Sequence, residues 1–242
     1  RQLGATLRGM PSLSLALLLP CFLLGLRLTG QGQPQGQPSG LLMEQPVRDY
    51  AADLRDLGRR YDVPLSGERI HRLRSYLTRK LAEVQAVDAA LLSRDGRIDR
   101  WLLLDHVQHQ LAQLTSEEAR MREIEPLLPH SAPLVAACEA HRRMEPVTGE
   151  AAAILLSNAA KQLRSAVQKL ETGAMDSVPI TTARTAAEAL QRLHEAFAAW
   201  FRFHDGYDPM FSWWARAPWK DYDEAQQAYR KALQHRLVDG KT

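Results

Sequence analysis

Apolar residues recur at intervals of three and four through almost the whole chain beyond its first forty residues. The stripe Ile70, Leu73, Leu77 and Leu81 is a clear case, and arginine and lysine crowd the opposite face. This spacing is that of one face of an α-helix, and no alternating apolar run of the kind that builds strands is present. Proline and glycine divide the pattern into about seven amphipathic helices. The sequence therefore predicts an all-α array, without the fixed repeat period of a solenoid.

The first 30 residues have the order of a secretory signal peptide. Two arginines form a basic start, residues 12–28 are almost entirely apolar, and small residues follow at Gly30 and Gly32. We expect cleavage near Gly30 to Gly32 and export to the periplasm or the extracellular medium, with no stable membrane association afterwards. A membrane anchor is the minor alternative, although the apolar run is short for a span and contains Pro20.

Residues 31–42 are rich in Gln, Gly and Pro and are expected to form a flexible tether ahead of a helical domain over residues 43–242. The chain holds 31 Lys and Arg against 28 Asp and Glu, and three of the arginines but none of the acids lie in residues 1–30. The remainder is therefore balanced at 28 of each sign. A balanced domain with interleaved charges does not have the basic patch of a nucleic-acid-binding protein.

An aromatic segment over residues 203–219 interrupts the helical pattern near its end. Three of the five tryptophans lie within seven positions of each other, and the same segment contains Pro209 and Pro218. Because proline ends or kinks a helix, we expect a rigid break between a helix that ends at His204 and a last helix that begins near Asp221.

This break predicts either a packing hub or the wall of a cleft, since aromatic side chains bury large areas in both settings. The candidate residues for substrate-cleft or packing roles are Tyr207, Asp208, Trp213, Trp214 and Trp219. Of the adjacent pair we expect Trp213 to pack inward, because it follows Phe211 at strand-like spacing, and Trp214 to face a groove.

Clusters of chemically active residues are sparse. His106 and His109 could face one metal ion from a helix, but no third ligand is fixed by spacing, so a solvated helix face is the expectation. Cys138 and His141 are also three apart, and Cys138 is expected to be a buried small residue. The His194–Glu195 pair lacks the second histidine of a zinc-protease helix. No catalytic residue and no metal ligand is assigned in this chain.

Several stretches of the sequence resemble the domain of unknown function 885 family. The segment from His204 to Tyr229 contains Tyr-Asp-Pro-Met-Phe-Ser-Trp-Trp, and residues 93–111 and 121–129 are also similar to that family. The resemblance covers most of residues 45–240 and corresponds to the N-terminal part of the family. It implies an α-helical, often exported protein similar to zinc metallopeptidases. Its presumed zinc motif, a His-Glu pair followed by Pro-Gly-His-His, has no match in this chain.

Two functions are consistent with these features. The chain is either the helical N-terminal region of an exported zinc-dependent peptidase or hydrolase, inactive alone and forming one wall of a peptide-substrate cleft, or a non-catalytic exported module. In the second case it would bind a protein or peptide through the tryptophan-rich segment. Zinc is implied only for the full-length family, and no cofactor is expected in this chain.

Overall fold

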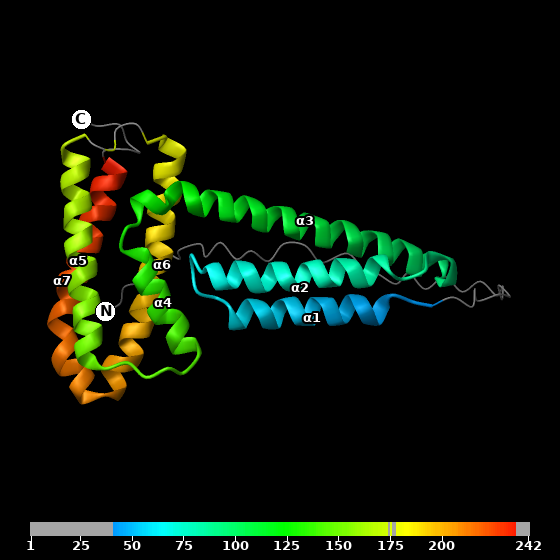
Figure 1. Cartoon of the computed structure of the whole chain (residues 1–242), viewed down its shortest axis with the longest axis horizontal. Helices are drawn as coiled ribbons and strands as arrows, with labels where there is room; N and C mark the ends of the chain where they lie inside the picture. The colour runs from blue at the N-terminus through cyan, green and yellow to red at the C-terminus, as the bar shows by residue number, and fades with distance from the viewer. Residues whose placement is uncertain (1–40, 174, 176–177, 236–242) are drawn as a thin grey trace, which may run out of the picture. The chain divides into compact units, whose positions relative to one another are not determined.

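The computed structural model describes residues 41–173, 175 and 178–235, which all belong to one compact unit over residues 38–242. Seven α-helices are formed within these residues, as predicted, and the only pairing of strand type there is an isolated bridge between Leu41 and Leu92 (Figure 1). The helices are α1 (Glu44–Arg60), α2 (Gly67–Gln85), α3 (Arg94–Ile124), α4 (Ser131–Arg142), α5 (Gly149–Glu171), α6 (Ile180–Tyr207) and α7 (Pro209–Leu233). The predicted signal peptide, residues 1–30, and all but the last two residues of the predicted tether lie outside the described residues.

Two groups of buried side chains hold the helices together. Helices α1 and α2 and most of α3 share the first group, in which Leu77 and Val107 are almost fully buried. Helices α4 to α7, with the C-terminal end of α3, share the second and larger group, which includes Leu156, Phe197 and Tyr229. Helix α3 has 31 residues and is therefore about 46 Å long, so one continuous helix contributes to both groups.

Helices α5 and α7 lie side by side over much of their lengths (Figure 1). Small side chains let two helix backbones approach closely, and α5 buries four alanines: Ala152, Ala159, Ala160 and Ala166. The hydroxyl of Tyr229 in α7 donates a hydrogen bond to the backbone carbonyl of Leu127 at 2.7 Å, which ties α7 to the short turn that follows α3.

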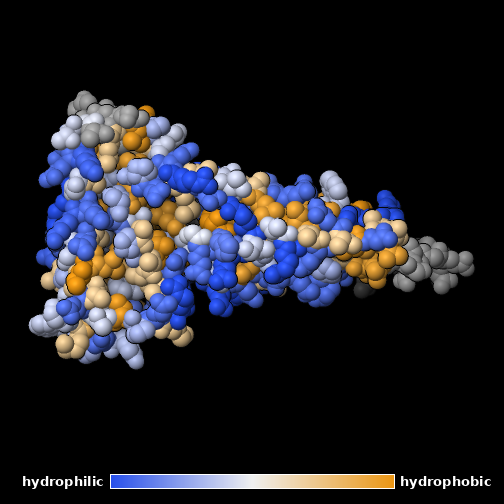
Figure 2. All heavy atoms as spheres, viewed as in Figure 1, coloured by the Kyte–Doolittle hydropathy of each residue, from blue (hydrophilic) through white to orange (hydrophobic). Residues whose placement is uncertain are grey.

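Helix α3 begins earlier than the sequence indicated. The Asp-Gly pair within residues 93–97 predicts a turn. Ser93 caps the helix instead, and its Oγ accepts a hydrogen bond from the backbone N–H of Gly96 at 3.0 Å. The buried face of α3 includes Leu103 and Val107, whereas Trp101 is 65% exposed. Figure 2 shows hydrophobic residues at the surface near this end of α3.

The predicted break over residues 203–219 is wrong in its extent. Helix α6 continues to Tyr207, and α7 begins at Pro209, with Asp208 as the cap between them. Proline is tolerated at the first helical position because its missing N–H would have no intrahelical partner there. Pro218 lies inside α7. The burial of apolar side chains on both sides of Pro218 offsets the cost of an interior proline, which is about 3 kcal/mol.

No helix within residues 41–173 or 178–235 has both the length and the apolar content that crossing a bilayer requires.

Candidate functional site

The junction of α6 and α7 carries the residues that the sequence singled out. Asp208 is partly buried, and its carboxylate accepts a hydrogen bond from the backbone N–H of Met210 at 2.9 Å. Asp205 and Arg216 bridge the two helices at 2.7 Å, and this hydrogen bond from Arg216 lowers the pKa of the Asp205 carboxyl. The Oγ of Ser212 donates to the backbone carbonyl of Asp205, also at 2.7 Å. The junction is therefore fixed by side chains of both helices.

The expectation that Trp213 packs inward is wrong. Trp213 is 72% exposed and Trp214 is 40% exposed, whereas Phe211 is fully buried. In a helix, residues two positions apart point in directions that differ by about 200° around the axis. A side chain two positions after a buried one therefore faces away from the core. The argument from strand-like spacing failed because the segment is helical.

Five large apolar residues on the two sides of the junction are exposed, and they are hereafter called the aromatic surface: Phe203, Tyr207, Met210, Trp213 and Trp214. The rings of Phe203 and Tyr207 are stacked at 6.2 Å, and those of Trp213 and Trp214 meet edge to face at 4.8 Å. Met210 precedes the two tryptophans by three and four positions and so shares their helix face. Tyr207 is 81% exposed.

Trp219 belongs instead to the aromatic core beneath this surface. Its ring stacks on Phe201 at 4.3 Å and on His194 at 5.9 Å, and it is partly buried. Phe197 and Trp200 stack at 4.7 Å within the same core. The packing hub expected from the tryptophan-rich segment therefore consists mainly of α6 residues, which the helical pattern alone marks only as a buried face.

Trp214 also lines a hollow of about 380 Å³ between α5 and α7. The opposite wall is formed by α5 residues that include Ile154, Ser157 and Lys161. Trp214 thus joins the aromatic surface to a hollow whose lining is both polar and apolar.

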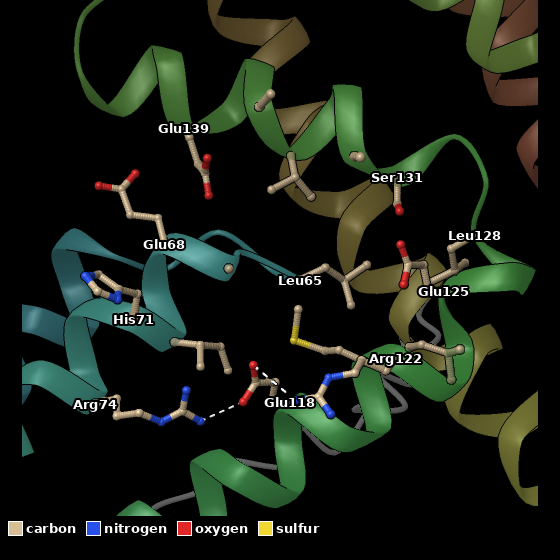
Figure 3. Close-up of a pocket in the computed structure, with 17 residues that line it drawn as sticks. Leu65, Glu68, His71, Arg74, Glu118, Arg122, Glu125, Leu128, Ser131 and Glu139 are labelled. Atoms are coloured by element: carbon tan, nitrogen blue, oxygen red, sulfur yellow. Dashed lines mark hydrogen bonds and ion pairs between the residues drawn. The ribbon is translucent and has the colours of Figure 1, made fainter.

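A larger cleft of about 640 Å³ lies between α2, α3 and α4 (Figure 3). Its apolar side chains include Leu65, Ile70, Met121, Leu128 and Val135, and its charged side chains are Glu68, Arg74, Glu118, Arg122, Glu125 and Glu139. Arg74 lies 2.8 Å and Arg122 3.3 Å from the carboxylate of Glu118, and these hydrogen bonds lower the pKa of that carboxyl. The lining contains four carboxylates and two guanidinium groups, and Glu68 pairs in addition with Arg72 and Arg143, which lie outside the lining.

The residues considered for metal binding or thiol chemistry include His106, His109 and Cys138. His106 is exposed and edge-on to Tyr50, and the ring of His109 is hydrogen-bonded to Gln113 at 2.8 Å. Within the described residues, no group of three or more metal-binding side chains converges. Cys138 is buried, and burial raises the pKa of its thiol to about 12, which keeps it protonated.

The structure brings together a histidine pair that the sequence did not indicate. His141 of α4 and His204 of α6 lie with ring centroids 5.2 Å apart, beside a hollow of about 390 Å³ that His141, Cys138 and Trp200 line. Burial lowers the pKa of both imidazoles. The two residues are 63 positions apart in the sequence, so spacing could not have identified the pair.

Comparison of the chain with protein-family models, with curated proteins and with solved structures yields no match.

Proposed function

We propose that this chain is a non-catalytic helical region of an exported hydrolase similar to zinc metallopeptidases. The aromatic surface is the face that binds the polypeptide carrying the catalytic residues. The exposure of Trp213 and Trp214, side by side on one face of α7, is the observation that carries the proposal. The same segment resembles the domain of unknown function 885 family. This resemblance supports the proposal that the partner is the catalytic region of such a hydrolase.

The physical basis is the amount of apolar surface left in water. Aromatic side chains bury roughly 150–250 Å² each when covered, and exposed apolar surface that is contiguous rather than scattered marks interaction sites. Tryptophan and tyrosine are enriched among the residues that dominate binding energy, where truncation to alanine costs about 2 kcal/mol or more. Trp213, Trp214 and Tyr207 supply three such residues around one junction that is itself held rigid.

A second function uses the same surface. The exposed tryptophan pair equally favours a free-standing exported module that binds a separate protein or peptide. In the first function the catalytic region is part of the same polypeptide, and in the second it is not needed. The two therefore differ in the identity of the partner rather than in the residues that bind it.

The experiment begins with the reading frame that follows the codon for Thr242. A continuation that encodes a His-Glu pair followed by Pro-Gly-His-His favours the first function, and the encoded polypeptide then serves as the binding partner. We expect it to bind the present chain, and the double substitution Trp213→Ala and Trp214→Ala to weaken binding at least about tenfold by calorimetry.

The matched control is Trp101→Ala, which removes an exposed tryptophan from α3 and is expected to leave binding unchanged. Equal weakening by the control, or none by the double variant, would overturn the role of the aromatic surface. Where no such continuation exists, a photo-reactive amino acid at position 210 should crosslink a separate protein in the producing cell. Crosslinking at position 101 to the same protein would argue against a specific surface.

A further inference from the structure

The first turns of α3 carry apolar side chains on the face of the helix that points away from its buried side. Ile98 is 47%, Trp101 65% and Leu102 51% exposed, whereas Leu103 and Val107 on the opposite face are buried. Hydrophobic residues are visible at the surface near this end of α3 (Figure 2). Apolar residues scattered singly are common at protein surfaces, whereas three that gather on one helix face indicate an interaction surface. None of them belongs to the aromatic surface.

Opposite charges stand at the two ends of this apolar face. Arg94 precedes Ile98 by four positions, and Asp105 follows Trp101 by four. At about 100° per residue, these four side chains leave the helix within about 60° of one another, and they are hereafter called the α3 stripe. Both charged side chains are exposed, and neither forms an ion pair with another residue in the part of the chain that the structure describes.

The order of residues in the α3 stripe is self-complementary. The midpoint between Arg94 and Asp105 lies between residues 99 and 100, and the midpoint between Ile98 and Trp101 lies at the same place. When a second copy of α3 is laid antiparallel about this midpoint, Arg94 faces the partner's Asp105, and Ile98 faces the partner's Trp101. The intervals of four, three and four positions are those at which two packed helices keep one seam in contact. Because both copies use the same surface, the contact closes at two copies.

We propose that this chain forms a homodimer in which two α3 helices pack antiparallel along the α3 stripe. Trp101 and Ile98 bury apolar surface at its centre, and two ion pairs between Arg94 and Asp105 close its ends. A parallel pair would set each of these charges against its own copy, and like charges across an interface disfavour that orientation. The stripe spans about 16 Å of helix, so the contact is smaller than the roughly 1,200–2,000 Å² of stable complexes, and reversible association in the micromolar range is expected.

Analytical ultracentrifugation of the full chain tests the dimer, over a concentration range of about 5 to 500 µM that covers weak association. We expect a reversible equilibrium between monomer and dimer. Trp101→Ala should raise the dissociation constant of the dimer at least about tenfold, since a tryptophan at the centre of an interface usually dominates its binding energy. Trp213→Ala removes an exposed tryptophan of the aromatic surface instead and should leave the dissociation constant unchanged.

Charge reversals test the antiparallel orientation. Arg94→Asp and Asp105→Arg should each raise the dissociation constant about three- to tenfold, because each creates two like-charge contacts in the antiparallel dimer. The double reversal should restore the dissociation constant to within about twofold of the parent, because the ion pairs form again with their ends exchanged. In a parallel pair neither single reversal would weaken association. Arg120→Asp reverses an exposed charge near the other end of α3 and is the control, with no effect expected.

Three outcomes would overturn the proposal. They are a chain that stays monomeric over the whole concentration range, an equal loss of association in the control Arg120→Asp, and a double reversal that associates no better than the single ones. Association that is lost with Trp213→Ala but kept with Trp101→Ala would also overturn it, since the aromatic surface would then join the two copies.

Discussion

Gly149→Ala tests the close packing of α5 against α7 that presents the aromatic surface. A Cβ atom built at Gly149 would lie 2.7 Å from the Cα of Phe211, 2.9 Å from the carbonyl oxygen of Met210 and 3.1 Å from the Cβ of Trp214. The two nearest atoms are backbone, so no side-chain rotation can relieve the contact. Glycine is therefore required here by the neighbouring helix rather than by its own backbone conformation.

The size of the effect follows from the cost of overpacking. Inserting a methyl group where backbone atoms leave no room costs about 1–3 kcal/mol, because the two helices must separate. Gly58→Ala in α1 is the matched control, since a Cβ there meets nothing within 4 Å. That change should instead raise the free energy of unfolding by roughly 0.5–1 kcal/mol, because alanine is the better helix former.

The assay is urea and thermal unfolding of the parent and the two variants, followed by circular dichroism. A loss of 1 kcal/mol lowers the melting temperature of a domain of this size by about 2–4 °C. Gly149→Ala should therefore melt at least about 2 °C below the parent, and Gly58→Ala should melt above it. If Gly149→Ala were as stable as the parent while Gly58→Ala behaved as expected, the contact of α5 with the backbone of α7 would be refuted.

Three further predictions concern single side chains. Trp200→Ala should cost about 3–5 kcal/mol of unfolding free energy because its ring is buried, whereas Trp213→Ala should change it by less than about 0.5 kcal/mol; two urea melts that coincide would contradict the assignment of core and surface. Tyr229→Phe should cost about 1–3 kcal/mol, since it leaves a buried backbone carbonyl without its donor at 2.7 Å, and an unchanged urea midpoint would show that the carbonyl finds another partner. His130 stays neutral in the folded chain down to about pH 4, while the unfolded chain protonates it near pH 6.5, so its contribution to stability falls as the pH is lowered between these values. His130→Phe should lack this component, and melts of the two proteins that run parallel from pH 7 to pH 4 would contradict it.

The helical class of this protein follows from local features that a sequence displays directly. The spacing of Ile70, Leu73 and Leu77 marks the face of α2 that is buried, and Ser66 provides its cap, with its Oγ accepting from the N–H of Arg69 at 2.9 Å. Helix formation and capping depend on residues within a few positions of each other. Ser93 has the same local capping signal as Ser66, but the Asp-Gly that follows it also favours a turn, so neighbouring residues alone do not decide between the two.

Local sequence features predicted only part of the candidate site. The tryptophan-rich segment could be singled out by composition, but the assignment of Trp213 to the core depended on treating the segment as non-helical. The contact between His141 and His204 left no sequence signal, because the two residues are 63 positions apart and lie on different helices. Contacts across such separations are set by how helices pack, and one sequence does not reveal that packing.

The sequence by itself determined that this chain forms about seven amphipathic helices, because helical periodicity and capping arise from neighbouring residues. Only the tertiary structure decided that Pro218 remains inside a helix, that Phe211 rather than Trp213 is buried, and that His141 meets His204. Each of these outcomes depends on apolar area buried against distant helices. That burial is strong enough to outweigh the preference of a single residue for another backbone conformation.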